Sequence, residues 1–256
     1  MTHFVPLHKS VALIGSGDLG LSHYLDCHVY LLHSDGEYAM IDAGSGLEPE
    51  RLIENLRQAM GGDISRLRYV LLTHCHGDHA GGVHPIQRIA SPQVATSEWE
   101  MEMLARGSDE DLGLLQARFA GTYPSDFLVL RTRGDLVLKH GSELTLGKLR
   151  IRTYITPGHT RESVCYLVDG GGETFLFSGD TVFWGGLIQL LNTPGSEISE
   201  YRRGVQSLAG LQVDCLFPGH GLWALRHGQA HIDKMLYYFR RSAIPPMPAF
   251  VEKIKI

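Results

Sequence analysis

Three histidines and one aspartate lie within six positions of this chain: His74, His76, Asp78 and His79. They directly follow residues 69–72, an apolar run that is typical of a buried strand. Because side chains two positions apart in an extended segment point the same way, His74 and His76 can bind one ion. Asp78 and His79 then face a second position. Imidazole and carboxylate ligands together favour zinc, iron or manganese over calcium or magnesium, which prefer oxygen ligands alone.

Three further ligand-type residues follow strand-like runs later in the chain. His159 and His220 each follow Pro-Gly, and Asp180 follows Ser-Gly. A closed metal site takes about four ligands, so the candidates are too many for one ion and suit two ions if Asp180 is shared. Without a metal, burying so many polar groups together costs on the order of several kcal/mol. The predicted metal ligands are His74, His76, Asp78, His79, His159, Asp180 and His220.

Other residues near these motifs have competing interpretations. Cys75 lies between two predicted ligands, where strand alternation turns its side chain away from the metal, so we expect a packed thiol. Asp42 either orients a ligand histidine or caps a turn. The remaining histidines lack such neighbours and are expected on the surface or in the core, with His23 and His84 as the first exceptions to consider.

The composition limits the range of functions. The chain has 256 residues, a formal net charge of -5 and no long basic run, which argues against binding to a nucleic acid backbone. No run approaches the roughly 20 apolar residues that would span a membrane, and residues 1–10 lack the layout of a signal peptide. The cysteines form no C-x-x-C pair, so neither a disulfide framework nor a zinc knuckle is expected. We therefore expect a cytoplasmic globular enzyme without a membrane or nucleic acid partner.

Apolar periodicity outlines the elements that position these residues. Strands are predicted at residues 11–14, 28–33, 38–41, 69–72, 150–155, 164–168, 174–177 and 213–217. Helices are predicted at residues 52–60, 97–106, 198–208 and 232–239. Ser97 and Glu100 read as a capping box that opens the second helix.

These elements alternate between strands and helices in two halves of the chain, which predicts a single α/β (α+β) domain over residues 1–242. Within it, residues 97–135 are expected to form a mostly helical insertion. Residues 243–256 are expected to form a C-terminal tail.

The ordered motifs resemble those of the metallo-β-lactamase superfamily. Residues 74–79 match its H-x-H-x-D-H signature in full, and the later family motifs appear in order around His159, Asp180 and His220. The resemblance implies a four-layer αββα sandwich with the metals in a cleft along one edge of its two sheets. It also implies two metal positions that share Asp180, the first held by His74, His76 and His159 and the second by Asp78, His79 and His220.

The same resemblance implies a hydrolase. Two zinc ions would hold a bridging hydroxide at neutral pH, and this hydroxide would attack the carbonyl carbon of the substrate. Asp180 and Asp78 are then the catalytic carboxylates, because Asp180 bridges the ions and either the other ion or Asp78 assists the leaving group. The expected substrate is a small ester, lactone or thioester. Assembly into a homo-oligomer stays open.

Departures from individual family members narrow the choice of substrate. The G-C-G-R motif of the glyoxalase II type is replaced at residues 185–188, which argues against glutathione thioesters. Phe183 stands where acyl-homoserine lactonases have a tyrosine. The main alternative is an oxidoreductase that resembles the persulfide dioxygenases, with one iron bound by His74, His159 and Asp180. Iron or manganese therefore remains open beside zinc, and a metal-binding protein without turnover is a third class.

An apolar pocket over the metals is a further expectation. Trp184 and the apolar residues at 187–190, together with the insertion near Trp99, would form its wall. Ordinary core packing of the same residues is the alternative.

Overall fold

Two β-sheets form the centre of the computed structural model, which describes residues 3–107, 110 and 112–248. The first sheet contains, in spatial order, β1 (Val5–His8), β2 (Val11–Gly15), β3 (Val29–Ser34), β4 (Glu37–Ile41), β5 (Leu67–Leu71), β6 (Gln93–Thr96) and β7 (Leu136–Val137). The second contains β12 (Cys215–Pro218), β11 (Thr174–Gly179), β10 (Val164–Asp169), β9 (Leu149–Ile155) and β8 (Glu143–Leu146). Strands β9, β11 and β12 run in the same direction, so their carboxyl ends meet at one edge.

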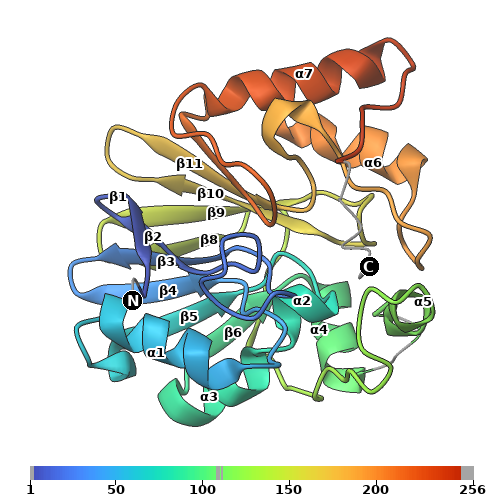
Figure 1. The fold of residues 1–256 in the computed structure, drawn as a ribbon. Helices are drawn as coiled ribbons and strands as arrows, with labels where there is room; N and C mark the ends of the chain where they lie inside the picture. Colours follow the sequence, from blue (N-terminus) through green and yellow to red (C-terminus); the bar gives the residue numbers. More distant parts are fainter. Residues whose placement is uncertain (1–2, 108–109, 111, 249–256) are drawn as a thin grey trace.

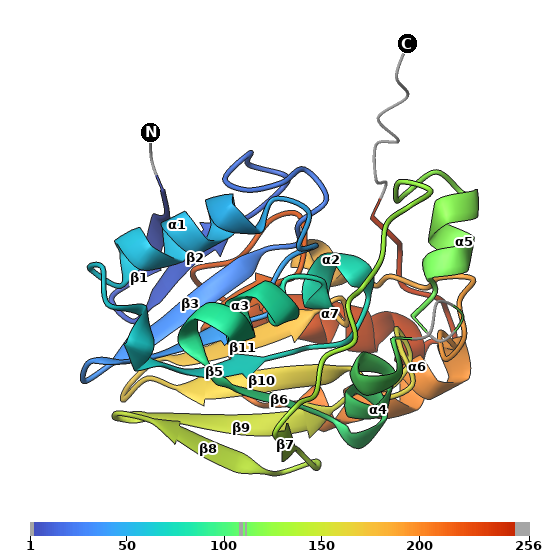
Figure 2. The same ribbon diagram turned by 90° about the horizontal axis from the view of Figure 1, so that it is seen from below.

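Helices cover the outer face of each sheet (Figures 1 and 2). Helices α1 (Pro49–Ala59) and α3 (Val83–Ala90) lie on the first sheet, and α6 (Ile198–Gly204) and α7 (Gly228–Arg240) lie on the second. The 3₁₀ turns are η1 (Ile64–Arg66), η2 (Trp184–Gly186) and η3 (Val205–Leu208). The order of layers is helix, sheet, sheet, helix, which confirms the predicted αββα sandwich.

Alternating side chains along the strands explain why the sheets pack in this way. On β3, Tyr30 and Leu32 belong to the apolar cluster between the two sheets, whereas Leu31 belongs to the cluster under the helices of the first sheet. Between the sheets, the ring of Tyr30 packs against those of Phe177 and Phe217, with ring centroids 5.3 and 5.4 Å apart. The interior of the sandwich is therefore a packed aromatic and aliphatic layer.

Strands β3 and β4 form a tight hairpin. Asp35 and Gly36 have φ values of 50° and 81°, the left-handed pair that a tight two-residue hairpin turn requires. Ser34 pairs with Glu37 across the turn, so the register of the two strands is fixed at this end.

Residues 97–135, between β6 and β7, are helical over two stretches. These are α4 (Glu98–Arg106) and α5 (Leu114–Phe119), and the described residues 122–135 form an irregular segment without a helix. The buried residues Met103, Leu114 and Phe127 join the apolar cluster under the first sheet. The segment is thus anchored in the core although much of it lacks regular structure.

The predicted capping box at the start of α4 was wrong. The Ser97 hydroxyl donates to the Glu162 carbonyl oxygen, and the Glu162 carboxylate accepts from the Trp99 amide at 2.8 Å. Glu100 accepts instead from the Cys75 amide. Tertiary partners therefore replace the local capping pair.

The described part of the C-terminal tail returns to the sandwich. The Ile188 amide donates to the Pro246 carbonyl at 3.0 Å. Residues 249–256 of the predicted tail lie outside the described residues, and the division into a domain at 1–242 and a tail stays a prediction. Within residues 3–107, 110 and 112–248, no helix is long and apolar enough to cross a membrane.

Candidate metal centre

All seven predicted ligands meet at one edge of the sandwich, beyond the carboxyl ends of four strands. The loop after β5 in the first sheet enters the short helix α2 (Gly77–Ala80) and carries the H-x-H-x-D-H cluster. The second sheet provides His159 after β9, Asp180 after β11 and His220 after β12. The site is therefore assembled from both sheets.

Three histidines form the first set of ligand atoms. The Nε2 atom of His159 lies 3.2 Å from Nε2 of His74 and 3.0 Å from Nδ1 of His76. Ligand nitrogens on a tetrahedral zinc ion, each about 2.0–2.1 Å from the metal, are roughly 3.3 Å apart. The spacing of this set fits one ion.

Asp78, His79 and His220 form the second set. The Nε2 atom of His220 lies 3.0 Å from Oδ2 of Asp78 and 3.3 Å from Nε2 of His79. Oδ2 of Asp78 and Nε2 of His79 are 3.7 Å apart. This set also has the spacing of three ligands around one ion.

Asp180 lies between the two sets. Its Oδ1 atom is 3.5 Å from Nε2 of His79, and its Oδ2 atom is 3.7 Å from Nε2 of both His159 and His220. Oδ1 is buried and has no hydrogen-bond partner in the described part of the chain. A buried carboxylate oxygen without a partner is costly, and a cation beside it would satisfy it. The donor set therefore fits two metal ions with Asp180 shared.

Hydrogen bonds behind three of the histidines fix which ring nitrogen faces the site. Nδ1 of His159 donates to the Gln189 carbonyl at 2.9 Å, and Nδ1 of His79 donates to Oδ2 of Asp42 at 2.9 Å. Nδ1 of His74 lies 3.1 Å from the Thr73 hydroxyl. Each contact turns Nε2, the other ring nitrogen, toward the centre, where its lone pair would bind the metal once any proton on it is displaced.

Asp42 lies behind His79 and also binds the turn after β5. Besides orienting His79, it accepts from the amide and the hydroxyl of Thr73, each at 2.8 Å. Its φ of 60° places it in the left-handed region, which aspartate tolerates better than most residues. Asp42 thus fixes both the turn that precedes the ligands and the ring of one of them.

The histidines of the two sets differ in the direction of their pKa shifts. Burial lowers the pKa of His74 well below its ordinary value, that of His76 to about 3 and that of His159 to about 4. These rings are therefore neutral at pH 7. For His79 and His220, burial acts in the same direction, but neighbouring carboxylates outweigh it and raise the pKa. The second set consequently attracts positive charge more strongly than the first.

The loop that carries His220 approaches Asp180 closely. A Cβ atom added to Gly219 would lie 2.3 Å from Oδ1 of Asp180 and 2.7 Å from Cε1 of His79, so any side chain there would displace a ligand. His28, which the sequence placed among ordinary histidines, supports the same loop. Its amide donates to the Gly219 carbonyl at 2.6 Å, and its buried ring bonds the Gly221 carbonyl at 2.8 Å.

Two buried side chains at the centre were missed in the sequence. The Tyr123 hydroxyl donates to Oδ1 of Asp78 at 2.6 Å. Glu100 accepts from the Cys75 amide at 2.9 Å and from the Thr160 hydroxyl. No local spacing marks either residue, because each contact joins segments far apart in the chain.

Other predicted residues lie away from the ligand atoms. The Cys75 thiol is buried and donates to the Glu100 carbonyl at 3.1 Å, which confirms a packed thiol. Trp184 is half-exposed beside His231, and Trp99 lies under the guanidinium of Arg161. Whether Trp184 and Trp99 border a substrate pocket stays a prediction.

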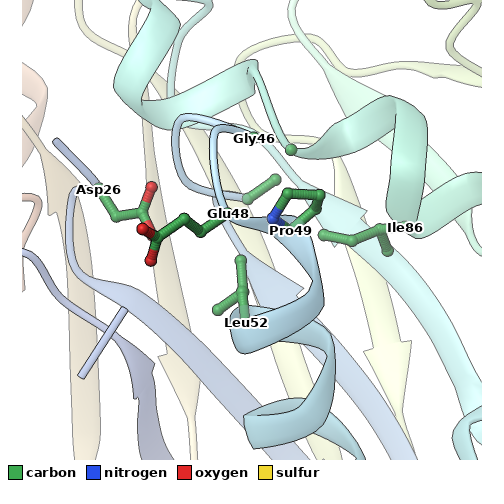
Figure 3. A pocket seen from close by; sticks show the side chains of 8 residues that line it. Asp26, Gly46, Glu48, Pro49, Leu52 and Ile86 are labelled. Carbon is green, nitrogen blue, oxygen red and sulfur yellow. The ribbon is translucent and has the colours of Figure 1, made fainter. Parts of the chain in front are cut away.

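A small hollow near the start of α1 is separate from the ligands (Figure 3). Its lining includes Asp26, Gly46, Glu48 and Leu52, and none of the seven predicted ligands. Asp26 accepts from the Ser45 amide at 2.7 Å and so braces the loop between β4 and α1.

Comparison with known proteins decides the family. A family model described as the metallo-beta-lactamase superfamily matches residues 24–220. The chain belongs to the metallo-beta-lactamase superfamily. As a member of this superfamily it is a metal-dependent hydrolase that acts on a small-molecule substrate.

Relatives and solved structures agree with this assignment. The chain is 32% identical over 210 residues to the protein named acyl-coenzyme A thioesterase MBLAC2 from Bos taurus. The alignment covers 75% of this chain and 72% of the relative. The Homo sapiens protein of the same name is 30% identical over 210 residues, with the same coverage. A metallo-beta-lactamase structure from Cronobacter sakazakii with a HARLDQ motif is 20% identical, with a TM-score of 0.73 and coverage of 94% of this chain and 92% of that one. At this identity, the likeness to the solved structure shows the fold alone.

Proposed function

We propose that the chain is a dinuclear zinc hydrolase that cleaves a small acyl thioester. The observation that carries the proposal is the pair of three-residue ligand sets with Asp180 between them. The names of the bovine and human relatives support a thioester as substrate. Esters and lactones share the same carbonyl chemistry and are the next substrates to compare.

In the proposed reaction, water adds to the acyl carbon and the carbon–sulfur bond breaks, giving a carboxylic acid and a thiol. Zinc ions, when bound, would supply hydroxide at neutral pH and polarise the acyl carbonyl. His74, His76 and His159 would hold the first ion and Asp78, His79 and His220 the second, with Asp180 shared. The hydrogen bonds behind His74, His79 and His159 keep the ligand nitrogens oriented before an ion binds.

The charge on Asp78 bears on the leaving group. His79 and His220 lower the pKa of this carboxyl even though its burial acts in the opposite direction. Asp78 is therefore ionised at neutral pH and binds or orients without donating a proton. A thiol has a pKa of about 8.5, so a thiolate departs without a proton more readily than an alkoxide does. A thioester consequently suits a centre in which Asp78 has no proton to donate.

The test combines metal content with thiol release. Purified protein is expected to contain about two zinc ions per chain. It should also hydrolyse an acyl-coenzyme A, and a thiol-reactive dye measures the thiol that is released. His76→Ala and Asp180→Ala should lose this activity. Retention of full hydrolytic activity by either variant would contradict the proposal.

The same measurement tests the oxidoreductase alternative. His74, His159 and Asp180 contain the two histidines and one carboxylate that a mononuclear iron centre uses, and their ligand atoms lie within 3.7 Å of His159 Nε2. About one iron per chain, with oxygen uptake on a persulfide, would favour that function. Asp78, His79 and His220 would then surround the centre without binding the metal.

A further inference from the structure

The segment between β6 and β7 sends one buried polar side chain to each half of the metal centre. Tyr123 reaches the second set of ligands and Glu100 reaches the loops of the first set. Tyr123 has 9% of its surface exposed and Glu100 has 2%. Neither belongs to the motifs that carry the ligands.

Tyr123 holds the Asp78 carboxylate by a direct hydrogen bond. Its hydroxyl donates to Oδ1 at 2.6 Å and accepts from the Asp78 amide at 3.2 Å. Oδ2, the other carboxylate oxygen, faces Nε2 of His220 at 3.0 Å. With both oxygens engaged, rotation of the carboxylate is restricted.

Packing also fixes the ring of Tyr123. Its centroid lies 4.6 Å from that of Phe127, and a Cβ atom added to Gly77 would lie 2.4 Å from the Phe127 ring. The irregular segment after α5 therefore lies directly against the backbone that precedes Asp78. The hydroxyl is held in place by this contact.

Glu100 ties together the two loops of the first set. Oε2 accepts from the amide of Cys75, the residue between His74 and His76. Oε1 accepts from the hydroxyl of Thr160, the residue after His159. One buried carboxylate thus joins a loop of the first sheet to a loop of the second.

We propose that Tyr123 and Glu100 are positioning residues that set the affinities of the two metal positions separately. Tyr123 acts on the second position through Asp78, and Glu100 acts on the first through the backbones beside His74, His76 and His159. The inference rests on the proposed two-metal function. Loss of such supporting hydrogen bonds typically weakens metal binding by about 10–100-fold.

The variants are chosen to change hydrogen bonds at nearly constant volume. Tyr123→Phe removes one hydroxyl. Glu100→Met removes both acceptors and leaves an unbranched side chain, whereas Glu100→Gln keeps an acceptor for the Cys75 amide and should restore most of the affinity. Tyr166→Phe is the matched control, because this buried hydroxyl donates to the Leu72 carbonyl at 2.8 Å and touches no ligand side chain.

The experiment is a zinc titration of the metal-free full chain against a chelating dye, repeated with cobalt and its absorption bands. Tyr123→Phe is expected to weaken binding at the second position by about 10–100-fold and leave the first position unchanged, whichever position fills first. Glu100→Met should weaken binding at the first position, with recovery in Glu100→Gln. Tyr166→Phe should leave both steps unchanged, and circular dichroism should show that every variant is folded.

Three results separate failure of the inference from failure of the proposed function. Wild-type protein that binds two ions, together with Tyr123→Phe that binds them equally well, would overturn the inference alone. The same holds if Tyr123→Phe and Glu100→Met weaken both steps alike, because that pattern reports general loosening. Wild-type protein that binds a single ion would overturn the two-metal function itself.

Discussion

The Nδ1 atom of His79 lies 2.9 Å from Oδ2 of Asp42, and both side chains are buried. This bond presents Nε2 of His79 to the metal centre. Replacement of Asp42 by asparagine keeps the left-handed backbone accessible but places an amide N–H group against the histidine. The ring must then change tautomer or move.

Asp42→Asn is therefore expected to lower zinc affinity by about 10–100-fold, with a parallel loss of thioester hydrolysis. Competition titration against a chelating dye measures the change. Asp26→Asn is the matched control, since buried Asp26 bonds Ser45 and no predicted ligand. Equal affinity in Asp42→Asn and wild type would contradict the role given to this carboxylate.

Gly219→Ala should damage the centre while leaving the fold intact. The new methyl group would lie 2.3 Å from Oδ1 of Asp180, so the carboxylate or the loop must shift. Displacement of a reacting group by roughly 1 Å can cost about 100-fold in rate. Steady-state kinetics would show this loss, and a rate equal to that of the wild type would contradict the close approach of Gly219 to Asp180.

Metal binding should depend on pH differently at the two positions. The raised pKa values of His79 and His220 mean that these rings carry protons which a metal must displace, so affinity at the second position falls as pH falls. His76 and His159, with pKa values of about 3 and about 4, are already neutral above that range. Calorimetric titration in buffers of different ionisation enthalpy counts the released protons. If the affinity for both ions does not change between about pH 5 and 8, the ligand assignment is wrong.

Removal of metal should destabilise the folded chain. At a free zinc concentration 100 times Kd, each ion contributes about 2.7 kcal/mol, which corresponds to roughly 5–10 °C in Tm for a chain of this size. Differential scanning calorimetry with and without a chelator measures the shift. Asp180→Ala should reduce it, because this carboxylate lies between both ligand sets. A Tm that is insensitive to the chelator would count against metal binding in the folded state.

The ligand residues could be found from the sequence because each follows a local pattern. A strand, a tight turn and a histidine or aspartate lie within a few residues of one another at Asp78, His159, Asp180 and His220. The buried strands were also predictable, because their apolar runs are continuous or alternate with a period of two. The αββα arrangement followed from the family resemblance.

Elements whose stability depends on distant partners were not predictable in this way. Helix α2 has four residues, including Gly77, and forms where the ligand loop packs against the segment of Tyr123 and Phe127. Strand β6 is equally short and is held by its parallel neighbours. The capping box failed for the same reason, since Glu162 from another loop binds the first turn of α4.

The contacts of Tyr123 and Glu100 illustrate the limit most clearly. Their partners, Asp78 and Thr160, are 45 and 60 residues away in the chain. Spacing within one segment holds no information on such pairs. These contacts form because the fold brings the two segments together.

The division of ligands between the two sheets has a consequence for the life of the protein in the cell. During synthesis, the loop with His74 to His79 leaves the ribosome well before His159, Asp180 and His220, because chains emerge from their N-terminus. A complete centre exists only after the second sheet has formed and docked on the first. Stable metal binding therefore requires a completely folded chain. A truncated or misassembled chain would differ from the folded protein in failing to retain the ions.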